Sequence, residues 1–144
     1  MSEFRRIDDS FYVAPQITAD DIQRAYDEGF GALIMNRPSG ETPDQPDTEE
    51  LIEASANHQL RFYHIPIVAP PSYEDIAATI EALNAENGNK VLAFCRSGTR
   101  SVTLWAYAMA KENTYPIETI LQKAAEAGYD LSGHRPRLEA IASN

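Results

Sequence analysis

The sequence is short of cysteine, of basic residues and of long apolar runs. Its 144 residues include a single cysteine, so no disulfide forms within the chain, and that cysteine is either a small buried apolar side chain or a free reactive thiol. No apolar run approaches the roughly 18 residues that a membrane-spanning helix needs. The first ten residues also lack the apolar segment of a secretion signal. We therefore expect a cytoplasmic protein without a membrane partner.

The shortage of basic residues argues against a further class of partner. Lys and Arg together number 12 against 22 Asp and Glu, which gives a formal net charge of −10. Binding to nucleic acid depends on a basic patch that releases counterions from phosphates, so we expect no nucleic-acid partner. The three histidines and the cysteine show no close metal-ligand spacing, and no glycine-rich nucleotide motif is present. The sequence therefore predicts no metal and no cofactor.

Predicted strands alternate with predicted helices over the first two thirds of the chain. Short β-branched, aromatic or apolar runs predict strands at 11–14, 32–35, 60–65 and 90–94. Helical patterns fill the intervals and the remainder of the chain, and no strand is predicted after Phe94. This alternation predicts an α/β fold with a central, mainly parallel sheet of four or five strands flanked by helices, in one domain over residues 1–144. Parallel strands share one carboxyl edge, so Cys95, Asn36 and Ile65 are expected along it.

The cysteine stands in the stretch "VLAFCRSGTRS", residues 91–101, directly after a predicted strand. A helix beginning near Thr99 would aim backbone N–H groups at the sulfur of Cys95 and stabilise a thiolate there. Arg100 can offer an oxyanion a planar fork of donors, and Gly98 suits a turn that approaches a ligand closely. The other polar loop residues are Arg96, Ser97 and Thr99. These residues favour an anion-binding loop with a nucleophilic cysteine over a cysteine of the core.

A second loop of interest covers residues 36–47 and is long for a simple connection. Asn36 begins it, Arg37 could add a positive contact to substrate, and Glu41 could bond the Cys95 loop or serve as an acid. The alternative is that Arg37 pairs with Glu41 and only braces the loop. The sequence leaves both interpretations open.

The segments "NRPSGE", "QP", "YHIPIV", "CRSGTRS" and "AGYDL" together resemble a bacterial family, the phosphatase-like domain of beta-lactamase hydrolase-like proteins. The resemblance covers nearly the whole chain and implies a fold like that of the tyrosine and dual-specificity phosphatases. It also implies Cys95 as nucleophile, Arg100 as anion clamp and a Ser101 hydroxyl near the thiolate. Members occur fused to metallo-hydrolase domains, which implies a functional link to such a domain.

The loop departs from the phosphatase pattern. Phosphatases of that fold place five residues between cysteine and arginine, whereas four stand between Cys95 and Arg100 here. Phe94 replaces the histidine that usually precedes the cysteine, and Ala69 stands where an aspartate is expected as general acid. Such an acid contributes about 10²–10⁴-fold to the rate. The shorter loop is similar to that of the rhodaneses, in which the cysteine carries a sulfane sulfur as a persulfide.

We therefore predict an enzyme that uses Cys95 for sulfane-sulfur transfer, with a small anionic substrate such as thiosulfate or a persulfide. The alternative is phosphomonoester hydrolysis through a cysteinyl-phosphate. A second alternative is a regulatory module that binds an anion in the same loop without catalysis.

Overall fold

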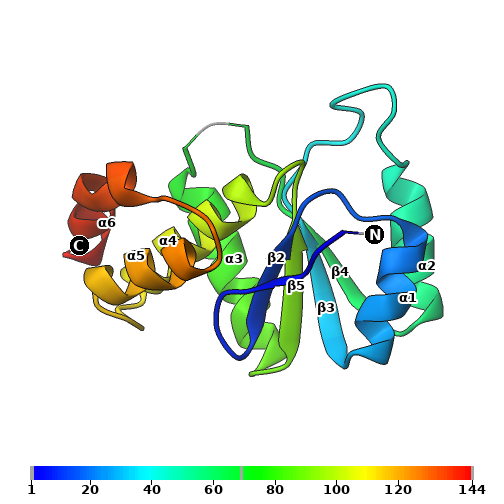
Figure 1. The fold of residues 1–144 in the computed structure, drawn as a ribbon, viewed down its shortest axis with the longest axis horizontal. Coiled ribbons are helices and arrows are strands. Elements are labelled where there is room, and N and C mark those ends of the chain that lie inside the picture. The colour runs from blue at the N-terminus through cyan, green and yellow to red at the C-terminus, as the bar shows by residue number, and fades with distance from the viewer. Residues whose placement is uncertain (1, 69, 144) are drawn as a thin grey trace.

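The computed structural model describes residues 2–68 and 70–143 (Figure 1). Its sheet has five strands in the order β1-β2-β5-β3-β4. All neighbouring strands are parallel except β1, which runs antiparallel to β2. The strands are β1 (Arg5–Arg6), β2 (Phe11–Ala14), β3 (Phe30–Met35), β4 (Arg61–His64) and β5 (Lys90–Phe94). The predicted α/β fold with a mainly parallel sheet is confirmed.

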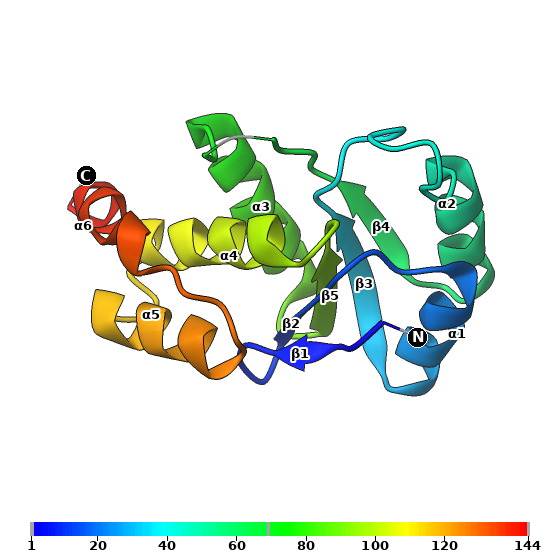
Figure 2. The same ribbon diagram turned by 45° about the horizontal axis from the view of Figure 1, so that its top comes forward.

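Helices cover both faces of this sheet (Figures 1 and 2). Two of them, α1 (Ala19–Asp27) and α2 (Thr48–Asn57), pack on one face, and the others lie on the opposite side of the sheet, the last ones packed against neighbouring helices. The second group comprises α3 (Tyr73–Glu86), α4 (Thr99–Lys111), α5 (Ile117–Glu126), the 3₁₀ helix η1 (Ser132–His134) and α6 (Arg135–Ala142). No strand follows Phe94 in the part of the chain that the structure describes, as predicted.

Two helices begin at capping boxes. The Thr18 side chain accepts from the backbone N–H of Asp21, and the Asp21 carboxylate accepts from the Thr18 backbone N–H. Ser72 and Asp75 repeat this exchange at the start of α3. Each exchange pairs backbone donors that the helix itself leaves unsatisfied. The Asp75 carboxylate is therefore committed to its helix.

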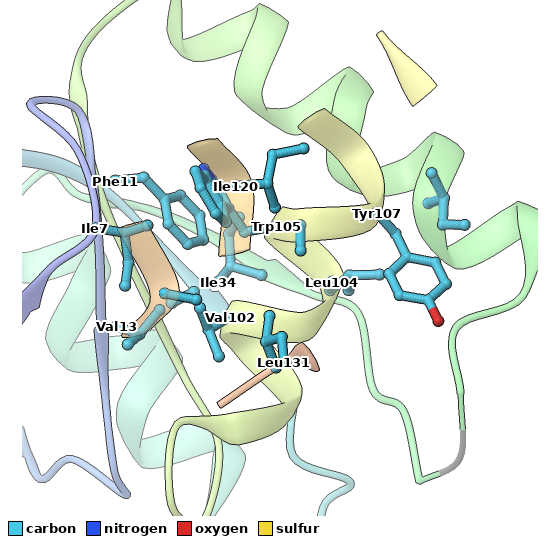
Figure 3. Close-up of a cluster of buried hydrophobic side chains, with 14 of the residues drawn as sticks. Ile7, Phe11, Val13, Ile34, Val102, Leu104, Trp105, Tyr107, Ile120 and Leu131 are labelled. Carbon is cyan, nitrogen blue, oxygen red and sulfur yellow. The ribbon is translucent and has the colours of Figure 1, made fainter. Parts of the chain in front are cut away.

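Strand β5 separates two apolar clusters because its side chains alternate between the faces of the sheet. Val91 and Ala93 belong to the larger cluster, and Leu92 and Phe94 to the smaller one beside α1 and α2. Figure 3 shows the larger cluster around α4, where Trp105 is fully buried. Helix α4 is buried nearly all round, which the apolar character of its sequence predicts. A helix so enclosed gives the loop that precedes it a rigid base.

Strand β1 is the element that the sequence did not predict. It has two residues, both arginine, so it carries neither the apolar alternation nor the β-branched residues that indicate a strand. Its place at the sheet edge comes from pairing with β2, in which Arg5 lies opposite Val13. Arginines suit an edge strand because charged side chains discourage pairing with another chain.

Candidate active site

Asn36 joins the carboxyl ends of three strands. Its backbone N–H donates to the Phe94 carbonyl oxygen at 2.8 Å, and its side-chain Nδ2 donates to the Ile65 carbonyl oxygen at 2.9 Å. Its own carbonyl accepts from the Ile67 N–H at 3.1 Å. The predicted placement of Cys95, Asn36 and Ile65 along one edge is confirmed. Asn36 is 1% exposed, so its side-chain amide holds the strand ends together and does not face solvent.

The cysteine loop connects the end of β5 to the first turn of α4. Cys95 is 0% exposed, and its Sγ accepts a hydrogen bond from the backbone N–H of Gly98 at 3.1 Å. Gly98 is the N-cap residue of α4 and has a φ of +94°, a conformation that residues with a side chain rarely adopt. The loop thus folds back so that a main-chain donor and the start of a helix both face the sulfur. Both features stabilise negative charge.

Contacts from distant segments hold this loop in place. The Cys95 N–H donates to the Ala14 carbonyl oxygen at 3.4 Å, and the Gln16 N–H donates to the Arg96 carbonyl oxygen at 3.3 Å. On another side, the Tyr129 hydroxyl donates to the Ser97 carbonyl oxygen at 3.1 Å. The sequence did not predict these contacts. Tyr129 lies in the motif "AGYDL", but the motif indicates no role for the tyrosine.

Arg100 is held by a carboxylate from the 36–47 loop. Its Nη1 and Nη2 donate to Oε2 and Oε1 of Glu41, each at 2.9 Å, and Nη1 also donates to the Ile67 carbonyl oxygen at 2.9 Å. The hydrogen bonds from Arg100 and then Arg37 lower the pKa of Glu41 to about 2. The pKa of Arg100 is raised, first by Glu41 and to a lesser extent by the charge of Cys95. The contacts with Glu41 and Ile67 thus fix the orientation of the Arg100 guanidinium.

Arg37 is 4% exposed, and its hydrogen bonds go to its own surroundings. Its Nε donates to Glu41 at 2.9 Å, its Nη1 to Gln16 Oε1 at 2.9 Å and its Nη2 to Thr42 Oγ1 at 3.0 Å. These contacts match the interpretation in which Arg37 braces the loop. Its role in binding substrate stays a prediction.

The remaining predicted loop residues fall into two groups. Arg96, Ser97 and Thr99 lie in the exposed part of the loop, and the hydroxyls of Ser97 and Thr99 are 3.1 Å apart. Ser101 is 1% exposed, and its hydroxyl has no hydrogen-bond partner among the described residues. Buried hydroxyls are normally paired, so the unpaired hydroxyl agrees with the role expected of Ser101 near the thiolate, and that role stays a prediction.

Two residues expected in phosphatases, the histidine before the cysteine and the aspartate acid, are replaced in this sequence by Phe94 and Ala69. Phe94 is 0% exposed in the smaller apolar cluster, so it belongs to the core and not to the site. Ala69, at the position expected for an acid, lies outside the described residues. Glu41 is ionised at neutral pH because its pKa is about 2. Within residues 2–68 and 70–143 no group of three or more His, Cys, Asp or Glu could hold a metal ion, and no helix could cross a bilayer.

Comparison with known proteins decides the family. Residues 3–112 match the beta-lactamase hydrolase-like protein, phosphatase-like domain. The chain belongs to this family. It is 28% identical over 126 residues to the beta-lactamase hydrolase-like protein of Agrobacterium fabrum and 26% identical over 126 residues to that of Xylella fastidiosa. These alignments cover 88% and 87% of this chain but only 29% of each relative, so this phosphatase-like domain corresponds to a part of those proteins.

Solved structures agree with the fold. A Neisseria meningitidis protein proposed to be a phosphatase is 31% identical, has a TM-score of 0.80, and the alignment covers 95% of this chain and 96% of that one. The phosphatase named PTPMT1 is 17% identical with a TM-score of 0.74, covering 98% of this chain and 94% of that one. At that identity the second likeness shows the fold alone. The predicted likeness in fold to the tyrosine phosphatases is thereby confirmed.

Proposed function

We propose that this phosphatase-like domain transfers a sulfane sulfur through Cys95. The observation that supports it is the state of Glu41, the carboxylate that contacts the anion clamp. Two arginines hold its pKa at about 2, so it has no proton to give to a leaving oxygen. Sulfur transfer between sulfur atoms requires no such proton, because sulfite and thiolates leave as anions.

The steps follow from the thiolate and the positive loop. The Cys95 thiolate attacks the outer sulfur of thiosulfate, a new S–S bond forms, and the old one breaks as sulfite departs with the electron pair. Arg100 and the Gly98 N–H would hold the anionic donor and then the persulfide. A second nucleophile, a thiolate or cyanide, attacks the outer sulfur and releases the Cys95 thiolate with its electron pair. The enzyme returns to its initial state without net oxidation.

Phosphomonoester hydrolysis is the second candidate, and the comparisons favour it over sulfur transfer. The family is described as phosphatase-like, and the Neisseria relative at 31% identity is proposed to be a phosphatase. In this mechanism Cys95 would attack phosphorus and form a cysteinyl-phosphate. The step needs a proton donor for the leaving oxygen or a substrate with a good leaving group.

One set of assays separates the two functions. Purified protein is incubated with thiosulfate and cyanide, and in parallel with p-nitrophenyl phosphate over a range of pH, with Cys95→Ser as the control for both. Sulfur transfer predicts thiocyanate formation and a mass gain of one sulfur atom on Cys95, both lost in Cys95→Ser. If neither thiocyanate nor the mass gain appears, and phosphate is released only when Cys95 is present, phosphomonoester hydrolysis replaces sulfur transfer as the function. If both activities are absent while sulfate still binds, the loop is an anion-binding module without catalysis.

The beta-lactamase hydrolase-like relatives also suggest a partner domain. Because the matched region is 29% of proteins named beta-lactamase hydrolase-like, we propose that the domain works together with a metallo-hydrolase domain. Co-purification of such a domain from the same cells, and a change in sulfur-transfer rate when it is added, would support this link.

A further inference from the structure

We propose that Tyr129 is a positioning residue for Cys95 and acts through the peptide unit between Ser97 and Gly98. The carbonyl oxygen of that unit accepts from the Tyr129 hydroxyl at 3.1 Å. The N–H of the same unit donates to Cys95 Sγ at 3.1 Å. A peptide unit is planar, and its C=O and N–H point in opposite directions. Holding the carbonyl therefore fixes the direction in which the N–H points.

Contact with the α-carbon of Gly98 fixes the same unit sterically. A Cβ atom on Gly98 would lie 2.2 Å from the Tyr129 hydroxyl oxygen and 3.1 Å from its Cζ. The end of the tyrosine ring thus packs against the glycine, which also has a φ of +94°. The tyrosine both bonds this peptide unit and limits its rotation.

Tyr129 is itself anchored by segments from opposite ends of the chain. It is 8% exposed, and its backbone N–H donates to the Ala124 carbonyl oxygen at 2.9 Å at the end of α5. The Arg5 guanidinium of β1 lies 5.2 Å from the centre of its ring. Burial raises the pKa of Tyr129, while Arg5 lowers it and the charge of Cys95 raises it. The hydroxyl therefore keeps its proton at neutral pH and remains a donor.

The bond from Tyr129 should strengthen the bond to the sulfur. Hydrogen bonds in a chain polarise one another, and a bond to an ionised acceptor is stronger than one to a neutral acceptor. The Tyr129 hydroxyl, the Ser97–Gly98 peptide unit and the Cys95 thiolate form such a chain. Among the described residues, the charged or titratable groups around the sulfur include Arg100 from α4, which Glu41 holds, and Tyr129 with Arg5 beside it. The inference needs a reactive Cys95 thiolate and is independent of which group Cys95 transfers.

The test measures the reactivity of Cys95 toward a small alkylating reagent. Because Cys95 is 0% exposed, the absolute rate also depends on opening of the loop, and the displacement of the pH profile is the readout that reports on the thiolate. Because Cys95 is the only cysteine, alkylation by iodoacetamide reports on this residue alone. For Tyr129→Phe we expect the alkylation rate at pH 7 to fall roughly threefold to tenfold, the range for one lost hydrogen bond, with the pH profile displaced to higher pH. The control is Tyr115→Phe, which removes a hydroxyl that donates to Asp8 at 2.9 Å. Its profile should match that of the wild type.

The result that would overturn the proposal is a Tyr129→Phe profile that superimposes on the wild type, or an equal displacement in Tyr115→Phe. A measurement on the unaltered protein covers the case in which Tyr129→Phe does not fold. In NMR spectra taken across the pH range, the Gly98 amide and the Tyr129 ring should change with one midpoint, that of Cys95 ionisation. A Tyr129 ring that does not respond at that midpoint rejects the proposal. These readouts need no turnover, so they remain valid whichever activity the assays reveal.

Discussion

Glu41 binds Arg100 through both carboxylate oxygens at 2.9 Å, although 59 positions separate the two residues in the chain. The same carboxylate accepts from Arg37 at 2.9 Å. Glu41 thus places two guanidiniums, one from the 36–47 loop and one from the first turn of α4. The orientation of Arg100, the predicted anion clamp, therefore depends on a residue that belongs to neither the cysteine loop nor its helix.

Replacing Glu41 by Gln should destabilise the protein. The change removes the negative charge between two guanidiniums, of which Arg37 is 4% exposed and has little access to water. We expect the free energy of unfolding to fall by about 1–3 kcal/mol, as for other bonds to buried charged groups. Urea denaturation measures this. The matched control is Glu28→Gln, a carboxylate that is 49% exposed and lies 3.7 Å from Arg24, and its effect should stay below about 1 kcal/mol. Equal effects of the two substitutions would contradict the prediction.

The same carboxylate predicts a dependence of stability on pH. The pKa of Glu41 is about 2 in the folded protein against 4.5 as its ordinary value. A lowered folded pKa means that the stabilisation is complete above pH 4.5 and is lost as the pH falls toward 2. We expect the difference in urea midpoint between wild type and Glu41→Gln to shrink over that interval. A difference that is constant from pH 6 to about pH 2 would show that the charge of Glu41 is not responsible.

Patterns within short stretches of sequence predict most of the strands and helices, and also the position of the cysteine loop. The strand predicted at 90–94 is present, and the cysteine loop follows it directly. The caps Thr18 and Ser72 and the apolar helix after the loop likewise depend on near neighbours in the chain. Strand β1 could not be predicted because its pairing with β2 determines its conformation. Its two residues are too few to show the alternation typical of a strand.

The parts of the site that could not be predicted depend on contacts between distant positions. Glu41 and Arg100 are 59 positions apart, and Tyr129 and Ser97 are 32 apart. The sequence shows that each residue type is present, but only the folded topology brings them together. The closure of the loop over Cys95, which is 0% exposed, also arises from tertiary packing.

Arg100→Lys should weaken anion binding while keeping the positive charge. Lysine is a point charge on a flexible stem, so it cannot make the paired contacts that Arg100 makes with Glu41 and Ile67. We expect the affinity for sulfate, which mimics both candidate substrates, to fall about tenfold to hundredfold, since bonds to charged groups contribute about 1.5–3 kcal/mol. Isothermal titration calorimetry measures it. Arg135→Lys, on the surface of α6, should bind sulfate as the wild type does. Unchanged affinity in Arg100→Lys would show that this arginine does not hold the anion.

Gly98→Ala should be costly for two separable reasons, strain at positive φ and contact with Tyr129. Gly29 separates them, because it has a φ of +87° and a Cβ atom there would meet nothing within 4 Å, so Gly29→Ala carries the strain alone, about 1–3 kcal/mol. Gly98→Ala should exceed that cost, since its Cβ would lie 2.2 Å from the Tyr129 hydroxyl oxygen. In a Tyr129→Phe background the nearest ring atom is Cζ at 3.1 Å, so part of the excess should disappear.

The double-mutant cycle for Gly98 and Tyr129, measured by urea denaturation, gives this relief as a coupling free energy. We expect the destabilisation by Gly98→Ala to be smaller in Tyr129→Phe by about 0.5–3 kcal/mol, the range for residues in direct contact. Two equal costs would mean that the loop shifts away from the tyrosine and that strain at Gly98 explains the whole effect. A coupling of the expected sign would tie the glycine of the cysteine loop to Tyr129, since the hydroxyl that limits Gly98 also bonds the peptide unit facing Cys95.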